Sequence, residues 1–367
     1  MSEDEDLDAL RAAVRGLLGA TPEANAWARL CGEVGVASLA VPSRYGGTGA
    51  GLPEVCVVLE ELGRTLTPCP MLGSAVLAAA ALLGSRDDDA CARLLPGIAA
   101  GSTTAALVWA GRDGQWDPAA PACHWDGRLH GEAHYVLDGA AAEVFVVAAR
   151  TDGGVRLFEV DPADTRRTGS TPLDATRPLA TVALDGCPAR PLGTAADQTA
   201  ALAHVRDVGC VALAAEQVGT AAHCLATTVA YTKQRVQFGR PIAHFQALQH
   251  RMADLHVLIE TARSAVWAAA EAAGTVGAGA PSGAAGPTGA AGPTGAGGPE
   301  LPLLAGVAKV HCTEVARRAA AEMVQLHGGI AITWEHEAHR YFKRAHGGAQ
   351  LLGQPREHIN RLAALVL

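Results

Sequence analysis

The stretch that decides the fold is YTKQRVQFGRPIAHFQALQHRMAD, which runs from Tyr231 to Asp254. Gly239 and Pro241 lie in its middle and disfavour a continuous helix there. Before them, residues 201–231 read as one helix, and after them apolar residues recur at helical spacings of three and four. The sequence therefore predicts two long helices joined by a short basic and aromatic elbow, Arg235–Ile242.

The elbow carries side chains that suit a nucleotide. Arg235 and Arg240 offer forked donors for phosphate, and Phe238 offers a flat face for a ring. Gln246 follows at the start of the next helix. An ordinary helix–loop–helix with a surface arginine and a core phenylalanine explains the same residues, so the elbow alone leaves both interpretations open.

Length and composition limit the class of protein. The 367 residues suffice for two or three domains, and the net charge of −8 argues against broad nucleic-acid binding. Hydrophobic residues make up 49%, much of it alanine, with no apolar run of about twenty residues that would predict a membrane span. The acidic start, MSEDEDLDALRAAVRGLL, differs from a secretory or transit peptide, so we expect a cytoplasmic protein.

No metal site is predicted. The nine cysteines contain no C-x-x-C pair and read mostly as small buried residues. The histidines near the C-terminus match no established ligand signature; they are His327, His336, His339 and His346.

The hydrophobic pattern changes twice along the chain and predicts a mainly α protein with a β middle domain. Residues 1–105 read as helical, residues 106–197 as strands and residues 198–367 as helices. Within the middle part, residues 105–109 and 180–184 are strand candidates, and Asp152-Gly153-Gly154 is a hairpin turn between 144–149 and 155–160. Residues 274–299, rich in Gly, Pro and Ala, predict a flexible loop.

A second glycine-rich point follows a buried helix stripe from Leu304 to Leu326. The stripe ends at His327-Gly328-Gly329, where a glycine suits a left-handed helix cap. Missing side chains would also let a pyrophosphate approach backbone amides.

Three stretches resemble the acyl-CoA dehydrogenase family, in the family's order and over most of the chain. They are VPSRYGGTGAGLPEVCVVLEELGR at Val41–Arg64, RVQFGRPIAHFQALQHRMAD at Arg235–Asp254, and QLHGGIAITWEHEAHRYFKRA at Gln325–Ala345. The resemblance, to a divergent actinobacterial-type member, implies an α–β–α architecture with a C-terminal four-helix bundle, assembled as a homotetramer or heterotetramer. It also implies FAD, an acyl thioester substrate carried on coenzyme A or a carrier protein, and reoxidation by an electron-transfer flavoprotein.

The resemblance also implies roles for individual residues. Gln325, Gly328, Gly329 and Arg235 would contact the adenosine-diphosphate part of the FAD of a neighbouring subunit, with Phe238 and Gln246 beside them. In the middle domain, the flavin-lining segment corresponds to Tyr135–Gly139. There Tyr135 could stack on the ring, whereas Leu137 lacks the hydroxyl that many members have.

The reaction of the family needs a base for the α-proton, donors for the developing enolate, and a flavin that accepts hydride. Leu352 stands where many members have the catalytic Glu, and Gly209 falls near the position that other members use. Seven residues after Gly209, Glu216 shares its helix face among small apolar neighbours. We predict Glu216 as a buried base with a raised pKa, with a core-edge Glu paired to an arginine as the alternative.

Other interpretations stay open. Asp207, close to the predicted helix start, and Glu335 are further candidates for the base. Alternatively the chain is a non-catalytic subunit that completes a partner's FAD site in a heteromer, as the missing Glu and the eroded middle-domain segments suggest. A flavin monooxygenase or other redox enzyme on the same fold would need no α-proton base.

Overall fold

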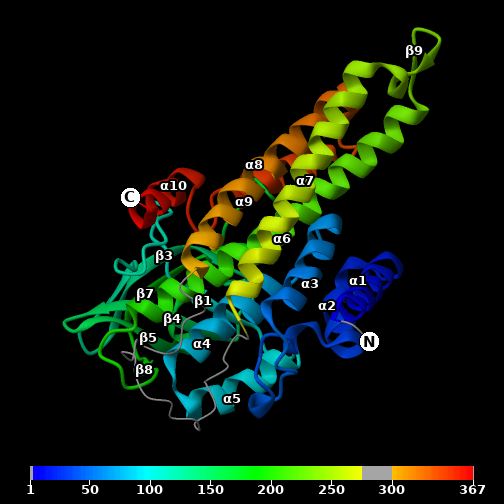
Figure 1. Ribbon diagram of the computed structural model, residues 1–367. Helices are drawn as coiled ribbons and strands as arrows, with labels where there is room; N and C mark the ends of the chain where they lie inside the picture. Colours follow the sequence, from blue (N-terminus) through cyan, green and yellow to red (C-terminus); the bar gives the residue numbers. More distant parts are fainter. Residues whose placement is uncertain (1–2, 275–299, 367) are drawn as a thin grey trace, which may run out of the picture.

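The computed structural model describes residues 3–274 and 300–366. Helices occupy both ends of this region and a β-sheet lies between them, which confirms the predicted fold class. A bundle of long helices extends away from the sheet and the N-terminal helices (Figure 1). The predicted loop at 274–299 lies, except for Gly274, outside the described residues.

The N-terminal helices pack on one side of the molecule. The glycine-rich loop at Tyr45–Gly49 is a turn, as the sequence predicts, and a side chain at Gly47 would lie 1.8 Å from the Val41 carbonyl oxygen. Glycine is therefore required there by close packing. The helices are α1 (Glu3–Ala20), α2 (Ala26–Arg29), α3 (Leu52–Thr65), α4 (Ala79–Ser85) and α5 (Asp88–Ala99).

The middle part is a mixed sheet in the order β6-β7-β3-β2-β4-β5-β8, with β1 parallel to β4. The predicted hairpin is confirmed: β4 and β5 are antiparallel and Thr151 pairs with Gly154 across the turn. The strands are β1 (Ala105–Val108), β2 (Cys123–Trp125), β3 (Leu129–Leu137), β4 (Val144–Thr151), β5 (Gly154–Val160), β6 (Arg166–Gly169), β7 (Leu179–Cys187) and β8 (Arg190–Pro191).

The C-terminal helices pack around α6. Its most apolar window is long enough to cross a membrane, but 83% of it is buried inside the protein, as in a core helix. The predicted stripe on α7 is buried at Leu255, Ile259, Ala262 and Val266. The helices are α6 (Thr199–Gln234), α7 (Gln246–Ala272), α8 (Leu301–His327), α9 (Ala338–Gly348) and α10 (Pro355–Val366), with β9 (Val236–Gln237) and β10 (Arg240–Pro241) between α6 and α7.

Two glycines bring α3 and α6 into backbone contact. A side chain at Gly63 would lie 2.0 Å from the Glu216 carbonyl oxygen, and one at Gly219 would lie 1.8 Å from that of Glu60. This close approach fixes the position of the middle of α6, where Glu216 lies, against the N-terminal helices.

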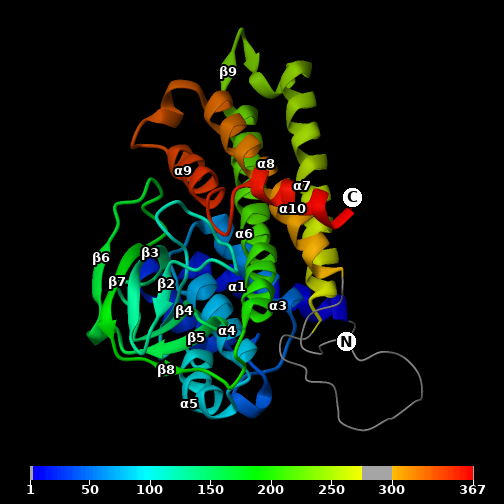
Figure 2. The same ribbon diagram turned by 90° about the vertical axis from the view of Figure 1, so that its left-hand side faces the viewer.

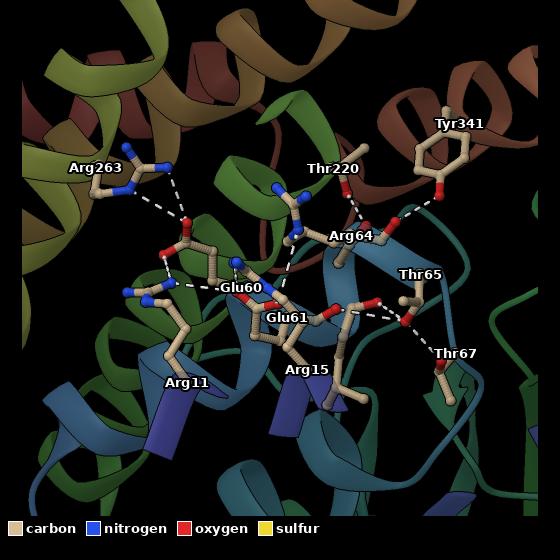
Figure 3. Close-up of polar contacts among 12 residues, drawn as sticks. Arg11, Arg15, Glu60, Glu61, Arg64, Thr65, Thr67, Thr220, Arg263 and Tyr341 are labelled. Atoms are coloured by element: carbon tan, nitrogen blue, oxygen red, sulfur yellow. Dashed lines mark hydrogen bonds and ion pairs between the residues drawn. The ribbon is translucent and has the colours of Figure 1, made fainter. Parts of the chain in front are cut away.

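A network of charges ties α1, α3 and α7 together (Figure 3). Glu61 is 1% exposed and receives two hydrogen bonds from Arg15, at 2.7 and 2.8 Å. Its neighbour Glu60 contacts Arg11 at 3.0 Å and Arg263 of α7 at 2.9 Å. Both carboxylates are thus satisfied by arginines from other helices, and the network is structural.

Candidate functional site

The elbow is a small β-hairpin. Gln237 pairs with Arg240, and the two turn residues, Phe238 and Gly239, both have positive φ, at +53° and +76°. Positive φ at both positions is the pattern of a type I′ turn, which normally avoids aromatic residues. Phe238 is nevertheless 91% exposed at the tip, and the Arg240 guanidinium lies 4.3 Å from the centre of the Phe245 ring. The elbow therefore presents an ordered aromatic and cationic surface to the outside.

The glycine turn, Gly328-Gly329 directly after α8, lies near the end of α6 that leads into this hairpin. Gly328 follows the last residue of α8 with φ +66° and ψ −144°, so it has positive φ but is not the left-handed helical cap that the sequence suggested. A side chain at Gly328 or Gly329 would meet nothing within 4 Å, which leaves open space against the backbone. The Tyr231 ring, one turn before the elbow, stacks on His327 at 4.3 Å, and among the described residues His327 Nε2 is buried without a hydrogen-bond partner.

These features fit the adenosine-diphosphate part of a nucleotide. The exposed arginines, the exposed phenylalanine and the open glycine backbone supply donors and a stacking face. Gln246 at the start of α7 and Gln325 near the end of α8 are exposed in the same region. The hairpin stands at the far tip of the bundle in both views (Figures 1 and 2).

The elbow is remote from the interior of its own chain. Arg235, the residue after α6, follows Glu216 by nineteen positions, which places the two about 28 Å apart along the helix axis. A group bound by the elbow therefore lies far from the Glu216 region of the same chain.

An interior cavity lies around Glu216, where the N-terminal helices, the sheet and the bundle meet. Leu59 and Leu62 of α3, Leu137 at the end of β3, and Arg344 of α9 line it together with Glu216. Its volume is about 20 Å³, the space of about one water molecule. Sites for organic ligands are typically about 300–1,000 Å³. The cavity therefore does not fit a flavin ring.

Glu216 is held in an internal ion pair. It is 5% exposed, as its apolar neighbours suggested, and its Oε1 contacts Arg177 and lies 3.2 Å from Arg344 Nε. Arg344 also binds Asp174 at 3.0 Å. The geometry matches the second interpretation of Glu216, a carboxylate paired with arginine.

The two positions where family members carry the base lie side by side. A side chain at Gly209 would lie 2.9 Å from a methyl carbon of Leu352 and 2.6 Å from one of Leu77. Leu352 is 1% exposed, and its carbonyl oxygen accepts a hydrogen bond from His358 at 2.8 Å. Leucine side chains therefore occupy the place of both bases.

The remaining predicted residues lie apart from the cavity. Asp207 is 3% exposed and pairs with Arg361 of α10; it lies well inside α6, so the predicted position close to the helix start is wrong. Glu335 is exposed. Tyr135 is 38% exposed, donates its hydroxyl hydrogen bond to the Arg112 carbonyl at 3.1 Å, and does not line the cavity. Within residues 3–274 and 300–366, no group of three or more His, Cys, Asp or Glu side chains could hold a metal ion.

Sequence reasoning missed most of the charges around Glu216. Arg344 follows Arg340 and Lys343 in a basic stretch that resembles a solvated helix face, yet it is only 5% exposed. A signal was present: Tyr341, Arg344 and Gly348 follow at helical spacing and share the buried face of α9. Asp138 also lines the cavity, and burial raises the pKa of its carboxyl to about 7.

Together the fold and the elbow define a three-part α–β–α protein with an exposed surface that suits a nucleotide. The models of the acyl-CoA dehydrogenase N-terminal and C-terminal domains match residues 5–102 and 199–366. The chain belongs to the acyl-CoA dehydrogenase family, whose members are oxidoreductases acting on CH–CH bonds.

Named relatives agree with this assignment. The chain is 39% identical to the acyl-CoA dehydrogenase IpdE2 of Mycobacterium tuberculosis, over 93% of this chain and 86% of that protein. It is 36% identical to IpdE2 of Mycolicibacterium smegmatis, over 98% and 93%. Among solved structures, the Tcur3481-Tcur3483 steroid ACAD G363A variant has a TM-score of 0.82 at 30% identity, with 100% of this chain and 98% of that chain covered. The ChsE4-ChsE5 complex from Mycobacterium tuberculosis has a TM-score of 0.84 at 25% identity, with 99% and 97% covered.

Proposed function

We propose that this chain is the non-catalytic subunit of a heteromeric, FAD-dependent acyl-CoA dehydrogenase. Its elbow and glycine turn hold the adenosine-diphosphate end of an FAD whose ring lies in a different, related chain. That partner supplies the base and binds the acyl thioester. FAD accepts the hydride in such an enzyme.

The observation that carries the proposal is the leucine packing at the base position. The two positions proposed for the catalytic carboxylate are Gly209 and Leu352, and the Leu352 side chain packs against Gly209. The Glu216 carboxylate forms ion pairs with two arginines, Arg177 and Arg344. Dehydrogenation needs a carboxylate that can reach a substrate proton, and neither arrangement offers one. A flavin monooxygenase would also need room for a ring, and the cavity around Glu216 has none.

The exposed elbow supports the other half of the proposal. Its arginines and Phe238 are exposed, and the hairpin stands at the tip of the bundle (Figure 1), so a nucleotide bound there lies against the outside of this chain and is open to contact with another molecule. Two of the similar structures carry paired names, Tcur3481-Tcur3483 and ChsE4-ChsE5, which agrees with a partner of the same family. Because the first is named a steroid ACAD, we propose an acyl thioester with a bulky, steroid-type acyl group as the substrate class. An electron-transfer flavoprotein would reoxidise the complex.

Purification of the chain alone and together with a co-expressed, related acyl-CoA dehydrogenase chain tests the proposal. We expect a colourless protein alone and a yellow complex with the partner, bleached by its acyl thioester under anaerobic conditions. A yellow homomer that one acyl thioester bleaches would contradict the proposal.

A further inference from the structure

Four charged side chains from separate parts of the fold meet beside the cavity around Glu216. Asp174 and Arg177 lie in the connection between β6 and β7, Glu216 on α6 and Arg344 on α9. Each of the four is 5–6% exposed. The sheet and the bundle therefore meet through buried charges.

The four charges balance one another. Arg177 binds Glu216, Arg344 Nε lies 3.2 Å from Glu216, and Arg344 binds Asp174 at 3.0 Å. Asp174 also accepts a hydrogen bond from the backbone amide of Thr176 at 3.0 Å. Two cations and two anions thus balance in net charge, while, within the described residues, Arg177 Nε and Arg344 Nε are buried without a hydrogen-bond partner. Removal of one member would leave an uncompensated buried charge, which is strongly destabilising.

The position of this group relates it to the flavin. Leu137 and Asp138, which line the cavity, belong to the segment that corresponds to the flavin-lining strand of the family. The charged side chains lie against this segment and leave about 20 Å³ free. A ring could enter only if they moved out of the cavity, against the cost of breaking a buried ion-pair network.

We propose that Asp174, Arg177, Glu216 and Arg344 form an ionic plug that closes this chain's own ring pocket and locks the sheet to the bundle. The inference rests on the proposed function and deepens it, because it explains why the chain serves a partner's FAD and holds none itself. Glu216 is then a structural residue of the plug.

Lumiflavin, which has the flavin ring without the nucleotide, tests the ring pocket separately from the elbow. We expect the full-length wild-type chain to leave lumiflavin fluorescence unquenched. The double variant Arg177→Ala with Glu216→Ala keeps the Arg344–Asp174 pair and the charge balance, and it should quench lumiflavin. Quenching by the wild-type chain, or none by a double variant whose circular dichroism is native, would overturn the plug.

A double-mutant cycle keeps the proposal testable if the alanine variant does not fold. Arg177→Met and Glu216→Leu should each lower the Tm, because each leaves a buried charge without its partner. Their combination removes one charge of each sign, and we expect it to recover at least half of the larger loss. Additive losses would overturn the plug.

The two proposals fail in different ways. Lumiflavin binding by the wild-type chain, together with a yellow complex that requires the partner, would refute the plug and leave the subunit function standing. Exclusion of lumiflavin, together with a partner that gains no FAD from this chain, would refute the subunit function alone.

Discussion

The substitution Asp138→Asn tests the electrostatics of the cavity. The Asp138 side chain lines the cavity and, within the described residues, forms no hydrogen bond or ion pair. Burial raises the pKa of this carboxyl from 3.8 to about 7, although Arg177 and Arg344 act in the opposite direction. The folded state therefore holds a proton that the unfolded chain releases near pH 4, and the folded protein loses stability as pH rises through the window from about 4 to about 7.

The size of the effect follows from the pKa difference. A difference of about three units corresponds to about 4 kcal/mol when Asp138 is fully ionised. Because the side chain keeps some contact with solvent, we expect about half of this, and hence a Tm higher by about 3 °C for Asp138→Asn at pH 8. Asparagine also tolerates the positive φ of +56° at this position. The gain should shrink steadily as pH falls toward 4.

Scanning calorimetry of the wild type and Asp138→Asn between pH 4 and pH 8 measures this difference. Asp152→Asn, at the exposed turn between β4 and β5, is the matched control and should change Tm little at any pH. A Tm gain that is the same at pH 4.5 and pH 8, or absent at both, would refute the reasoning.

Two further substitutions separate the elbow from the scaffold. Arg235→Ala should lower the FAD content of the complex with the partner, measured by absorbance, without changing the Tm of the chain alone, since Arg235 is exposed; full FAD retention would exclude Arg235 from nucleotide binding. Glu61→Gln should reduce the free energy of unfolding by about 1–2 kcal/mol in urea, less than for a fully buried pair because Arg15 is 56% exposed. The exposed pair Arg29–Glu33 offers the control Glu33→Gln, which should leave the free energy of unfolding almost unchanged; equal effects of the two substitutions would show that the α3 network adds nothing to stability.

The fold could be predicted because its signals are local and repeated. The apolar spacing on α7 and α8 spans several turns, and Asp152-Gly153 is a strong hairpin signal. The short strands β2, β6 and β8 were missed because two to four residues give no clear alternation. These segments are strands because they pair with longer neighbouring strands, and not because of their own hydrophobic pattern.

The candidate site could be predicted only in part. The elbow between the two helices could be predicted because glycine, proline, arginine and phenylalanine cluster within a few positions, while its role in nucleotide binding stays a prediction. The cavity was not, because Arg177, Glu216 and Arg344 come from distant parts of the chain and only folding makes them neighbours. A pattern identified Glu216 as buried, yet only the structure reveals its partners.

The stoichiometry of FAD to this chain in the assembled complex tests the central claim most directly. With an equal number of partner chains, the account predicts one FAD per pair of chains, and none on this chain when it is purified alone. One FAD on every chain, or a full complement in a homomer, would contradict it.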